Sequence, residues 1–339
     1  MVATSINHTS RRAKYPTYSM KKMTNCPFCG GRLFAIYNGL QDRLFTTTQT
    51  FSCSECGSCH MGMLNPTVIG DTADFYPPNY LSDENETAKP SNGKRFDLEK
   101  WYRYNQYHFD FNLLFQAVGL SLATARSYLD IGCGSGERVL YASEMGCQDA
   151  QGIDKFDFAK TRPKENVRLI HGDILAYKPV HKIQIASLFH VLEHVENPRE
   201  VLEHLQANVI GKQGYMIAQV PNYGSWERRL FGSRWFSWDV PRHLWQFNAQ
   251  SLKKIMEDAG FTVVATYQKN APLHPVTIVP SLFKELDVQR IWVNRRHGRL
   301  YKHSMVLLWA GLTIVTIPFT LLQNLFNRSA MLTIIVNNP

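Results

Sequence analysis

The chain has 339 residues, 44% of them hydrophobic and 19% charged, and its formal net charge is +9. This length suggests about two domains, the apolar content is ample for a core, and the lack of an internal repeat or low-complexity run excludes a repeat protein. The positive charge fits a nucleic-acid surface or an anionic membrane surface and by itself decides for neither.

The first segment, residues 1–23, is basic and polar and lacks the apolar stretch of a secretory signal. We therefore expect a flexible tail on a cytoplasmic protein. Cysteines in such a protein are expected to be reduced, so Cys-x-x-Cys pairs indicate metal ligands rather than disulfides.

Residues 24–65 hold two such pairs, Cys26/Cys29 and Cys53/Cys56. Each pair presents two thiolates on one turn, and two turns close a tetrahedral site suited to zinc. We expect a zinc ribbon in which the metal mainly folds a segment too short for its own core. Cys59 and His60 are additional potential ligands, so the spacing leaves the fourth ligand open.

Residues 66–92 are predicted to be a linker, because they are rich in proline and polar residues. Two tyrosines of this linker, Tyr76 and Tyr80, can pack on the next domain or reach over its site. The next domain is expected to span residues 93–339. It begins with an amphipathic helix from Asp97 to Leu120, in which apolar residues recur at spacings of three and four.

Predicted strands and helices then alternate, which is typical of a parallel, doubly wound α/β sheet. The predicted strands are Tyr128–Ile131, one that ends at Asp154, Val167–His171, Ile183–Leu188, Gly214–Val220, Phe261–Tyr267 and Met331–Val336. The predicted helices are Glu137–Met145, one from Pro198 to about Val209 with Asn197 as its cap, and Phe247–Ala259.

The loop after the first strand carries glycine at alternate positions, Gly132, Gly134 and Gly136, and Asp130 precedes them. Glycines let a ligand approach the backbone without meeting a Cβ atom. The pattern departs from the dinucleotide fingerprint G-x-G-x-x-G. It resembles motif I of the class I S-adenosylmethionine-dependent methyltransferases, hydrophobic-x-D-x-G-x-G-x-G. The resemblance implies a Rossmann-like sheet with an antiparallel last strand, and it implies that Asp130 faces the methionine end of the cofactor above the glycine loop.

Two further acids follow the second and third strands. Asp154 lies about twenty residues after the glycines, where an acid can accept hydrogen bonds from both ribose hydroxyls. Asp173, with Ile174 beside it, follows the third strand, and the resemblance implies that it meets the adenine amine. Taken alone, each acid can equally be a helix cap. Together with the glycine loop they predict a cofactor pocket at the carboxyl edge of the sheet.

The segment His190-Val-Leu-Glu193-His194-Val follows the fourth strand and resembles the H-V-L-E-H-V segment of small-molecule methyltransferases, including the ubiquinone-pathway O-methyltransferases. The order H-x-x-E-H also matches inverted zinc peptidases, but no third ligand is evident, so we expect no metal here. His190 is a candidate cofactor contact and a candidate base or substrate-positioning residue. A local bond at the cofactor loop is the alternative for this histidine.

Residues 235–245 are dense in tryptophan and include Arg242 and His243. Similar W-x-x-D-x-P-x-H segments occur in methyltransferases of bacterial polysaccharide and secondary-metabolite clusters. We expect a substrate wall, with Arg242 for a phosphate or carboxylate and His243 as a base. The alternative is a packed loop with its tryptophans in the core.

Residues 305–322 form an apolar run without a charge, after a basic stretch. Composition suggests a membrane helix. A single crossing is excluded if Met331–Val336 returns to the sheet, because both must then lie in one compartment. We therefore expect an insertion at about 290–326 that lies in the membrane interface, dips in and returns, or packs as a buried helix, at the cytoplasmic face of a membrane.

These features predict an S-adenosylmethionine-dependent methyltransferase (EC 2.1.1.-) with a structural Zn²⁺ ion. The expected reaction is O-methylation of a small-molecule, lipid-linked or saccharide acceptor, with peripheral membrane contact and without nucleic acid. Two alternatives remain. One is an RNA methyltransferase that uses the ribbon for RNA contact, and the other is a non-catalytic zinc or membrane adaptor on a methyltransferase scaffold.

Overall fold

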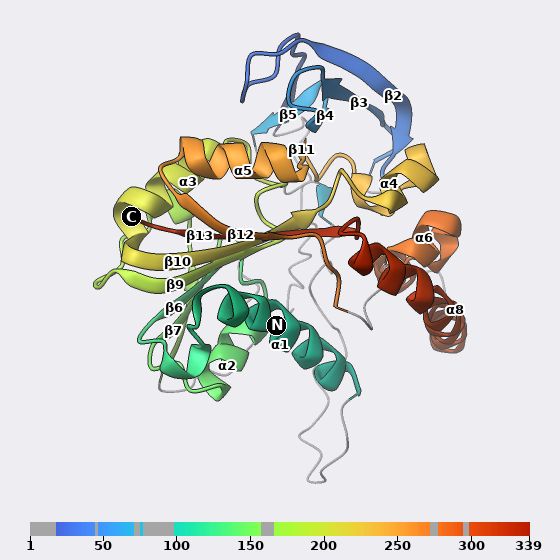
Figure 1. Cartoon of the computed structure of the whole chain (residues 1–339). Coiled ribbons are helices and arrows are strands. Elements are labelled where there is room, and N and C mark those ends of the chain that lie inside the picture. Colours follow the sequence, from blue (N-terminus) through green and yellow to red (C-terminus); the bar gives the residue numbers. More distant parts are fainter. Residues whose placement is uncertain are drawn as a thin grey trace, which may run out of the picture.

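The computed structural model describes residues 18–44, 47–70, 75–76, 98–156, 166–271, 277–293 and 298–339. A central sheet carries helices on both faces, a set of N-terminal strands lies against one side of this layer, and a long C-terminal helix lies at its edge (Figure 1). Most of the predicted linker, including Tyr80, lies outside the described residues.

The central sheet has seven strands in the order β12-β13-β10-β9-β6-β7-β8. Strand β13 is antiparallel to both its neighbours, β10 and β12, while the pairs among β10, β9, β6, β7 and β8 are parallel. The predicted fold class is thereby confirmed, including the return of the last strand between the fifth and the sixth. The bounds are β6 (Tyr128–Ile131), β7 (Ala150–Asp154), β8 (Val167–His171), β9 (Ile183–Phe189), β10 (Ile210–Pro221), β12 (Thr262–Tyr267) and β13 (Met331–Asn337).

Helices cover both faces of this sheet. Helices α1 (Leu98–Val118) and α2 (Glu137–Glu144) lie on one face, and α3 (Pro198–His204) and α5 (Ala249–Asp258) lie on the other (Figure 1). Because both faces are covered, the inner strands are mostly apolar, and every residue of β6 is buried. The Asn197 side chain caps α3 as predicted, and the helix continues through a π-helical turn, η4 (Leu205–Val209).

The N-terminal strands form a unit that is wider than the sequence suggested. They are β1 (Tyr18–Lys21), β2 (Leu33–Gln41), β3 (Thr50–Cys56), β4 (Gly62–Leu64) and β5 (Thr67–Gly70). Strand β1 pairs with β5, so the ordered unit begins inside the segment predicted as a tail and ends beyond residue 65. We call residues 18–70 the N-terminal unit.

This unit is joined to the main domain by a shared sheet. Strand β11 (Trp245–Gln246) pairs with β4, which gives the four-stranded order β11-β4-β3-β2. The Phe28 ring meets the Trp245 ring edge-on at 5.0 Å, and Tyr37 meets Trp238 at 5.4 Å. One continuous apolar core therefore runs from the N-terminal unit into the main domain.

The tryptophan-rich segment supplies most of this interface. This segment, residues 235–245, follows α4 (Trp226–Phe231) and the short turn η5 (Gly232–Arg234), and it contains the turn η6 (Phe236–Trp238). Trp235, Trp238 and Trp245 are all buried, so their faces are not available to a substrate. The expected substrate wall is therefore wrong for these tryptophans, because their rings pack in the core that the main domain shares with the N-terminal unit.

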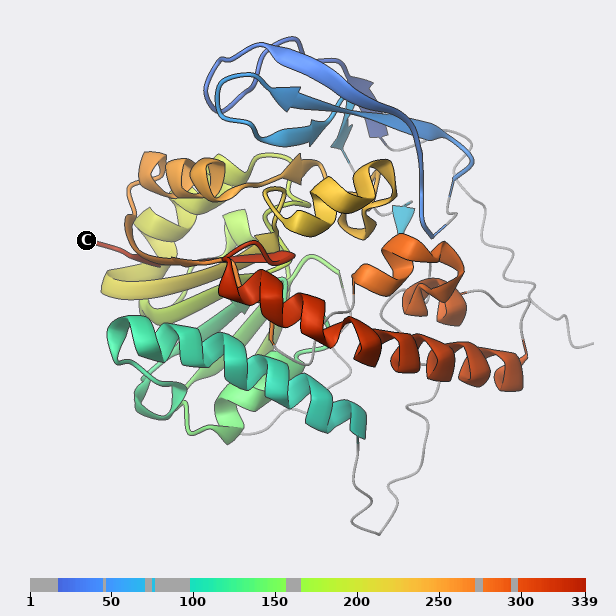
Figure 2. The same cartoon turned by 45° about the vertical axis from the view of Figure 1, so that its right-hand side comes forward.

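The apolar run lies in α8 (Arg299–Leu325), which extends along the edge of the molecule beside α6 (Ile278–Leu282), η7 (Lys284–Leu286) and α7 (Val288–Val293) (Figure 2). Among the described residues α8 is the one helix long and apolar enough to cross a membrane, and 11% of its most apolar window is buried. Strand β13 follows it directly and lies in the central sheet, as predicted.

Candidate functional site

The glycine loop connects β6 to α2 at the carboxyl edge of the sheet. Gly132, Gly134 and Gly136 all have positive φ, at 71°, 52° and 81°, in the region that other residues rarely adopt. A Cβ atom on Gly132 would lie 2.5 Å from Cγ2 of Val191. The loop therefore needs glycine both for its own conformation and for close contact with the segment that follows β9.

Asp154 ties this loop to the neighbouring strand. Its Oδ2 accepts a hydrogen bond from the Gly134 N–H at 2.9 Å, and its Oδ1 accepts one from the Phe156 N–H at 2.9 Å. Each carboxylate oxygen keeps a further lone pair for a ligand hydroxyl. The acid is thus held at the end of β7, next to the glycine loop, where the sequence placed it.

Asp173 lies two residues beyond β8 and is exposed, while Ile174 beside it is half-buried. The Asp173 side chain accepts a hydrogen bond from the Leu175 N–H at 3.0 Å and caps the short turn η3 (Ile174–Ala176). The structure therefore shows the capping role that was the alternative for this acid.

Asp130 lies deeper than the other two acids. It is buried at the end of β6, and its Oδ1 accepts a hydrogen bond from the Ser187 hydroxyl at 2.6 Å. Burial raises the pKa of its carboxyl group. Asp130 is therefore held beneath the loop by Ser187. Only the carboxylate lone pairs that this hydrogen bond leaves free can contact a cofactor.

A polar group that the sequence analysis missed lies under the same edge. Asp110 of α1 is buried, accepts a hydrogen bond from Gln219 Nε2 at 3.0 Å and faces Arg138 of α2 at 3.5 Å. The guanidinium of Arg138 stacks over the Phe189 ring at 3.6 Å. Burial raises the pKa of Asp110 to about 6. The sequence signal for this buried acid was its position between two aromatic residues, in Phe109-Asp110-Phe111.

The segment after β9 closes over the glycine loop. His190 has a positive φ of 59°, and its backbone N–H donates to the Gln219 carbonyl at 2.9 Å. Its ring is half-exposed, and Nδ1 lies 3.2 Å from Glu193 Oε1. His190 is thus at the strand end where a substrate-facing or cofactor-facing residue was expected.

Arg242 does not face a pocket. The side chain is completely buried, and its guanidinium bonds Asp42 at 2.7 Å, Asp239 at 2.6 Å and the Phe75 carbonyl at 2.9 Å. The expected role as an anion-binding residue is therefore wrong, because the guanidinium group is buried and its hydrogen bonds go to groups of the protein itself. Arg242 joins the N-terminal unit to the main domain.

His243 is also buried. Its Nδ1 lies 2.8 Å from the Ser237 carbonyl, and its ring meets the His194 ring edge-on at 4.6 Å. Burial lowers the pKa of His243 to about 4, which makes it a weak base. The prediction of His243 as a base is corrected accordingly, and His190 is the more exposed histidine of the two.

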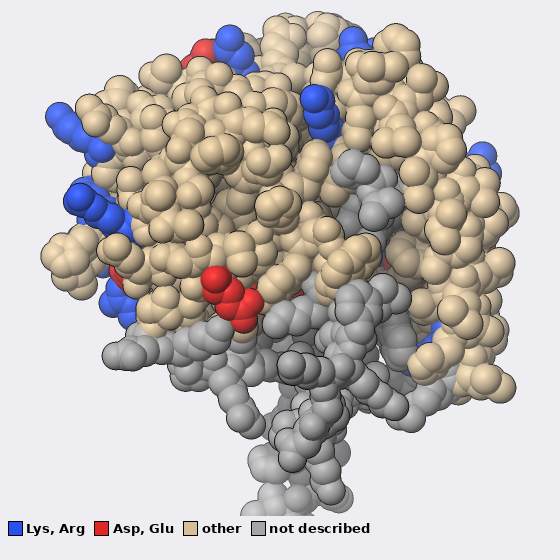
Figure 3. Space-filling model, turned by 60° about the horizontal axis from the view of Figure 1, so that its bottom comes forward, with Lys and Arg blue, Asp and Glu red and all other residues tan. Residues whose placement is uncertain are grey.

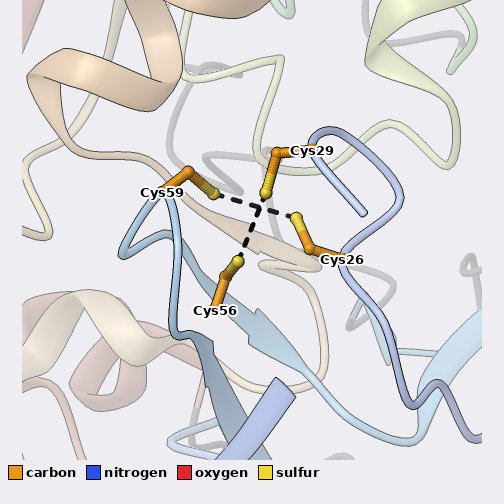
Figure 4. A group of neighbouring side chains, drawn as sticks. All are labelled: Cys26, Cys29, Cys56 and Cys59. Atoms are coloured by element: carbon orange, nitrogen blue, oxygen red, sulfur yellow. Dashed lines mark hydrogen bonds between the residues drawn. The ribbon is translucent and has the colours of Figure 1, made fainter. Parts of the chain in front are cut away.

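Four cysteines converge in the N-terminal unit: Cys26, Cys29, Cys56 and Cys59 (Figure 4). Their sulfurs all lie within 4.8 Å of one another, with Cys26–Cys59 at 3.8 Å and Cys29–Cys56 at 3.3 Å. A tetrahedral zinc centre with bonds of about 2.3 Å places its sulfurs about 3.8 Å apart. The donor set and its spacing therefore fit a structural zinc ion, and all four ligands come from protein.

Cys53, one of the four predicted ligands, is not in this cluster. Residues three apart in a strand point to opposite faces, and Cys53 and Cys56 both lie on β3. The second pair is instead Cys56/Cys59, on the turn that follows the strand. Cys53 is buried as an ordinary core thiol, and burial raises its pKa to about 12.

Comparison with known proteins agrees with this picture. Residues 102–266 match the family model described as a methyltransferase domain. No curated protein sequence matches the chain at a significant level. The matched segment covers the strands from β6 to β12 together with the glycine loop and the three acids.

Several solved structures are similar in outline. A SAM-dependent methyltransferase from Archaeoglobus fulgidus has 17% identity, covers 71% of this chain and 100% of its own, and gives a TM-score of 0.42. An S-adenosylmethionine-dependent methyltransferase from Mesorhizobium loti has 13% identity over 67% and 97%, with a TM-score of 0.43. The N-methyltransferase NodS from Bradyrhizobium japonicum, in complex with S-adenosyl-L-homocysteine, has 15% identity over 48% and 78%, with a TM-score of 0.36. Similarities this distant carry no argument on the acceptor.

Proposed function

We propose that this protein transfers a methyl group from S-adenosylmethionine to a hydroxyl group of a small-molecule, lipid-linked or saccharide acceptor at the cytoplasmic face of a membrane. The observation that carries the proposal is the hydrogen bond between the glycine loop and Asp154. The Gly134 N–H donates to the Asp154 carboxylate at the end of the neighbouring strand. The same edge holds Asp130, Asp173 and His190. Ligands of open α/β sheets bind at this edge.

The cofactor, when bound, supplies a methyl group that is already activated by its sulfonium. The chain would hold it through the backbone of the glycine loop, with Asp154 on the ribose and Asp173, with Ile174, at the base. Holding an acceptor in line is then the main task, and orientation can supply about 7–11 kcal/mol of the barrier.

A hydroxyl acceptor must also lose a proton. The His190 side chain is 38% exposed at this edge, next to the glycine loop, and Glu193 on its Nδ1 side orients it. We assign His190 as the base for this reason. His243 is unsuited to the task, since burial lowers its pKa to about 4.

Membrane contact is proposed from the orientation of α8. After Ser304 its large exposed side chains are apolar, with Leu307 at 73%, Ile314 at 65% and Val315 at 74% exposure, while the polar Thr313, Thr320 and Gln323 are buried. A helix on a water-facing surface shows the opposite arrangement. The side of the molecule on which Figure 1 places α6 and α8 carries few charged side chains in the described part of the view in Figure 3.

Sedimentation with liposomes tests the membrane contact. The full chain is expected to pellet with vesicles that contain anionic lipid. The variant Leu307→Glu/Ile314→Glu/Val315→Glu should remain in the supernatant, and Val180→Glu, an exposed apolar residue on the main domain, serves as the matched control. A full chain that stays soluble with vesicles and without detergent contradicts this part of the proposal.

The reaction itself is tested with isotopically labelled cofactor. The enzyme is incubated with the lipid and the aqueous fractions of a cell extract, and products are identified by mass spectrometry. The proposal expects label in an O-methyl group in the lipid or saccharide fraction. Label found in RNA, or no label together with no cofactor binding by calorimetry, would overturn it.

A further inference from the structure

A second group of metal-binding side chains lies beside the candidate cofactor site. Glu193, His194 and His243 each offer one ligand atom, and these atoms lie within 4.8 Å of one another. Glu193 and His194 come from the segment after β9, and His243 comes from the tryptophan-rich segment about fifty residues later. The backbone joins the two segments directly, because the Leu244 N–H donates to the Glu193 carbonyl at 2.7 Å.

Each of the two imidazole rings has one nitrogen held by a backbone carbonyl group. Nδ1 of His194 lies 3.0 Å from the Arg242 carbonyl and 3.2 Å from the Tyr76 hydroxyl, and Nδ1 of His243 lies 2.8 Å from the Ser237 carbonyl. A carbonyl oxygen only accepts, so Nδ1 carries the hydrogen in both rings and Nε2 keeps its lone pair. This is the arrangement in which protein histidines bind metals, with the second nitrogen fixed by a carbonyl group.

One oxygen of the Glu193 carboxylate lacks a partner among the described residues. The side chain is completely buried, its Oε1 lies 3.2 Å from His190, and its Oε2 has no hydrogen-bond partner in the described part of the chain. The two nearby guanidinium groups are taken, since Arg242 pairs with Asp42 and Asp239, and Arg43 pairs with Asp239 and Asp287. A buried carboxylate oxygen without a partner is costly, and a bound cation would offset that cost.

We propose that Glu193, His194 and His243 bind a divalent transition-metal ion. Two imidazole nitrogens and one carboxylate favour zinc, iron(II), cobalt(II) or nickel(II) over magnesium or calcium, which prefer oxygen ligands. Three protein ligands leave coordination positions open. The site is separate from the cysteine cluster, whose four ligands come from the N-terminal unit.

The surroundings suggest what the open positions hold. The Tyr76 ring packs on Phe156 at 5.5 Å, two residues after Asp154, and Val191 lies against Gly132. The ion would therefore lie beside the cofactor pocket, where it can bind the acceptor's oxygen and lower the pKa of its hydroxyl group. This role rests on the proposed function, whereas the metal site itself does not.

Cobalt(II) is the probe that separates the two metal sites. The full-length protein is treated with EDTA to remove labile metal, dialysed against Co²⁺ and analysed for metal content and visible absorption. We expect one labile Co²⁺ per chain, with ligand-field bands and without sulfur-to-metal charge transfer. Glu193→Gln, which keeps the shape of the side chain, should lose this ion and lower cobalt affinity at least tenfold.

Two matched variants complete the experiment. His190→Gln removes the neighbouring histidine and should keep the cobalt ion, and Cys59→Ser should lose the cysteine-bound metal and keep the cobalt bands if the chain stays folded by circular dichroism. Cobalt binding that is absent in the wild type, or equal in the wild type and Glu193→Gln, overturns the proposal. Calorimetry with S-adenosylmethionine on the same samples reports separately on the proposed function.

Discussion

Glu227 of α4 is a buried acid whose titration should control stability. The side chain is completely buried beneath the C-terminal helices, its Oε2 accepts a hydrogen bond from Thr277 at 2.5 Å, and its Oε1 has no partner in the described part of the chain. Burial raises its pKa from 4.5 to about 7. The difference corresponds to about 3 kcal/mol of the free energy of unfolding.

The sign follows from proton binding. Below pH 4.5 the carboxyl group is neutral in both states and costs nothing. As the pH rises from 4.5 to about 7, the unfolded chain releases the proton first, so the folded state loses stability, and above pH 7 the full cost of about 3 kcal/mol remains. Glu227→Gln removes this titration while keeping the shape and the hydrogen-bonding capacity of the side chain.

Urea unfolding of both proteins at pH 5 and pH 8 measures the effect. The free energy of unfolding of the variant, relative to that of the wild type, should rise by most of this amount from pH 5 to pH 8. Other titrating groups affect both proteins equally, so their contributions cancel in this comparison. Glu285→Gln, an exposed position on η7, is the control and should show no such gain. An equal difference at both pH values would show that Glu227 titrates normally and would refute the reasoning.

Three further outcomes are expected. Asp154→Asn should weaken S-adenosylmethionine binding by at least about tenfold in calorimetry, because hydrogen bonds to a charged group contribute about 1.5–3 kcal/mol each; unchanged affinity would move the pocket elsewhere. Arg242→Met should lower the free energy of unfolding by about 3–5 kcal/mol, since it leaves Asp42 and Asp239 buried without their partner; a variant with normal stability and a raised KM would restore the substrate-binding role. Cys59→Ser should lose zinc, as measured by mass spectrometry of the native protein, and Cys53→Ser should retain it; the reverse result would restore the predicted ligand set.

The sheet was predictable because its strands are covered on both sides. Strands such as β6 and β9 are short, mostly apolar runs bounded by glycine, acids or polar turns. These runs are too short for a buried helix, so a strand is the element they predict. The last strand was found in the same way, and its place between β10 and β12 followed from the family resemblance. The glycine loop was equally local, because glycine stands at each of the three alternate positions that need a positive φ, Gly132, Gly134 and Gly136.

The errors concern contacts between distant segments. Cys53 was chosen over Cys59 because both spacings are Cys-x-x-Cys, although an extended β3 puts Cys53 and Cys56 on opposite faces. The tryptophan-rich segment has the composition of either a substrate wall or an interface, and only the pairing of β11 with β4 decides for the interface. The burial of Arg242 depends in the same way on Asp42, two hundred residues away.

The N-terminal unit is therefore part of the site's framework rather than an appendage. Strand β4 pairs with β11. At the start of β11, the N–H groups of Leu244 and Trp245 donate hydrogen bonds to the Glu193 carbonyl at 2.7 and 3.3 Å. Arg242 fastens the same segment to Asp42. These bonds hold His243 against His194 at the carboxyl edge of β9, so a metal ion that orders the cysteine cluster also helps to order the edge of the sheet where the chemistry is proposed.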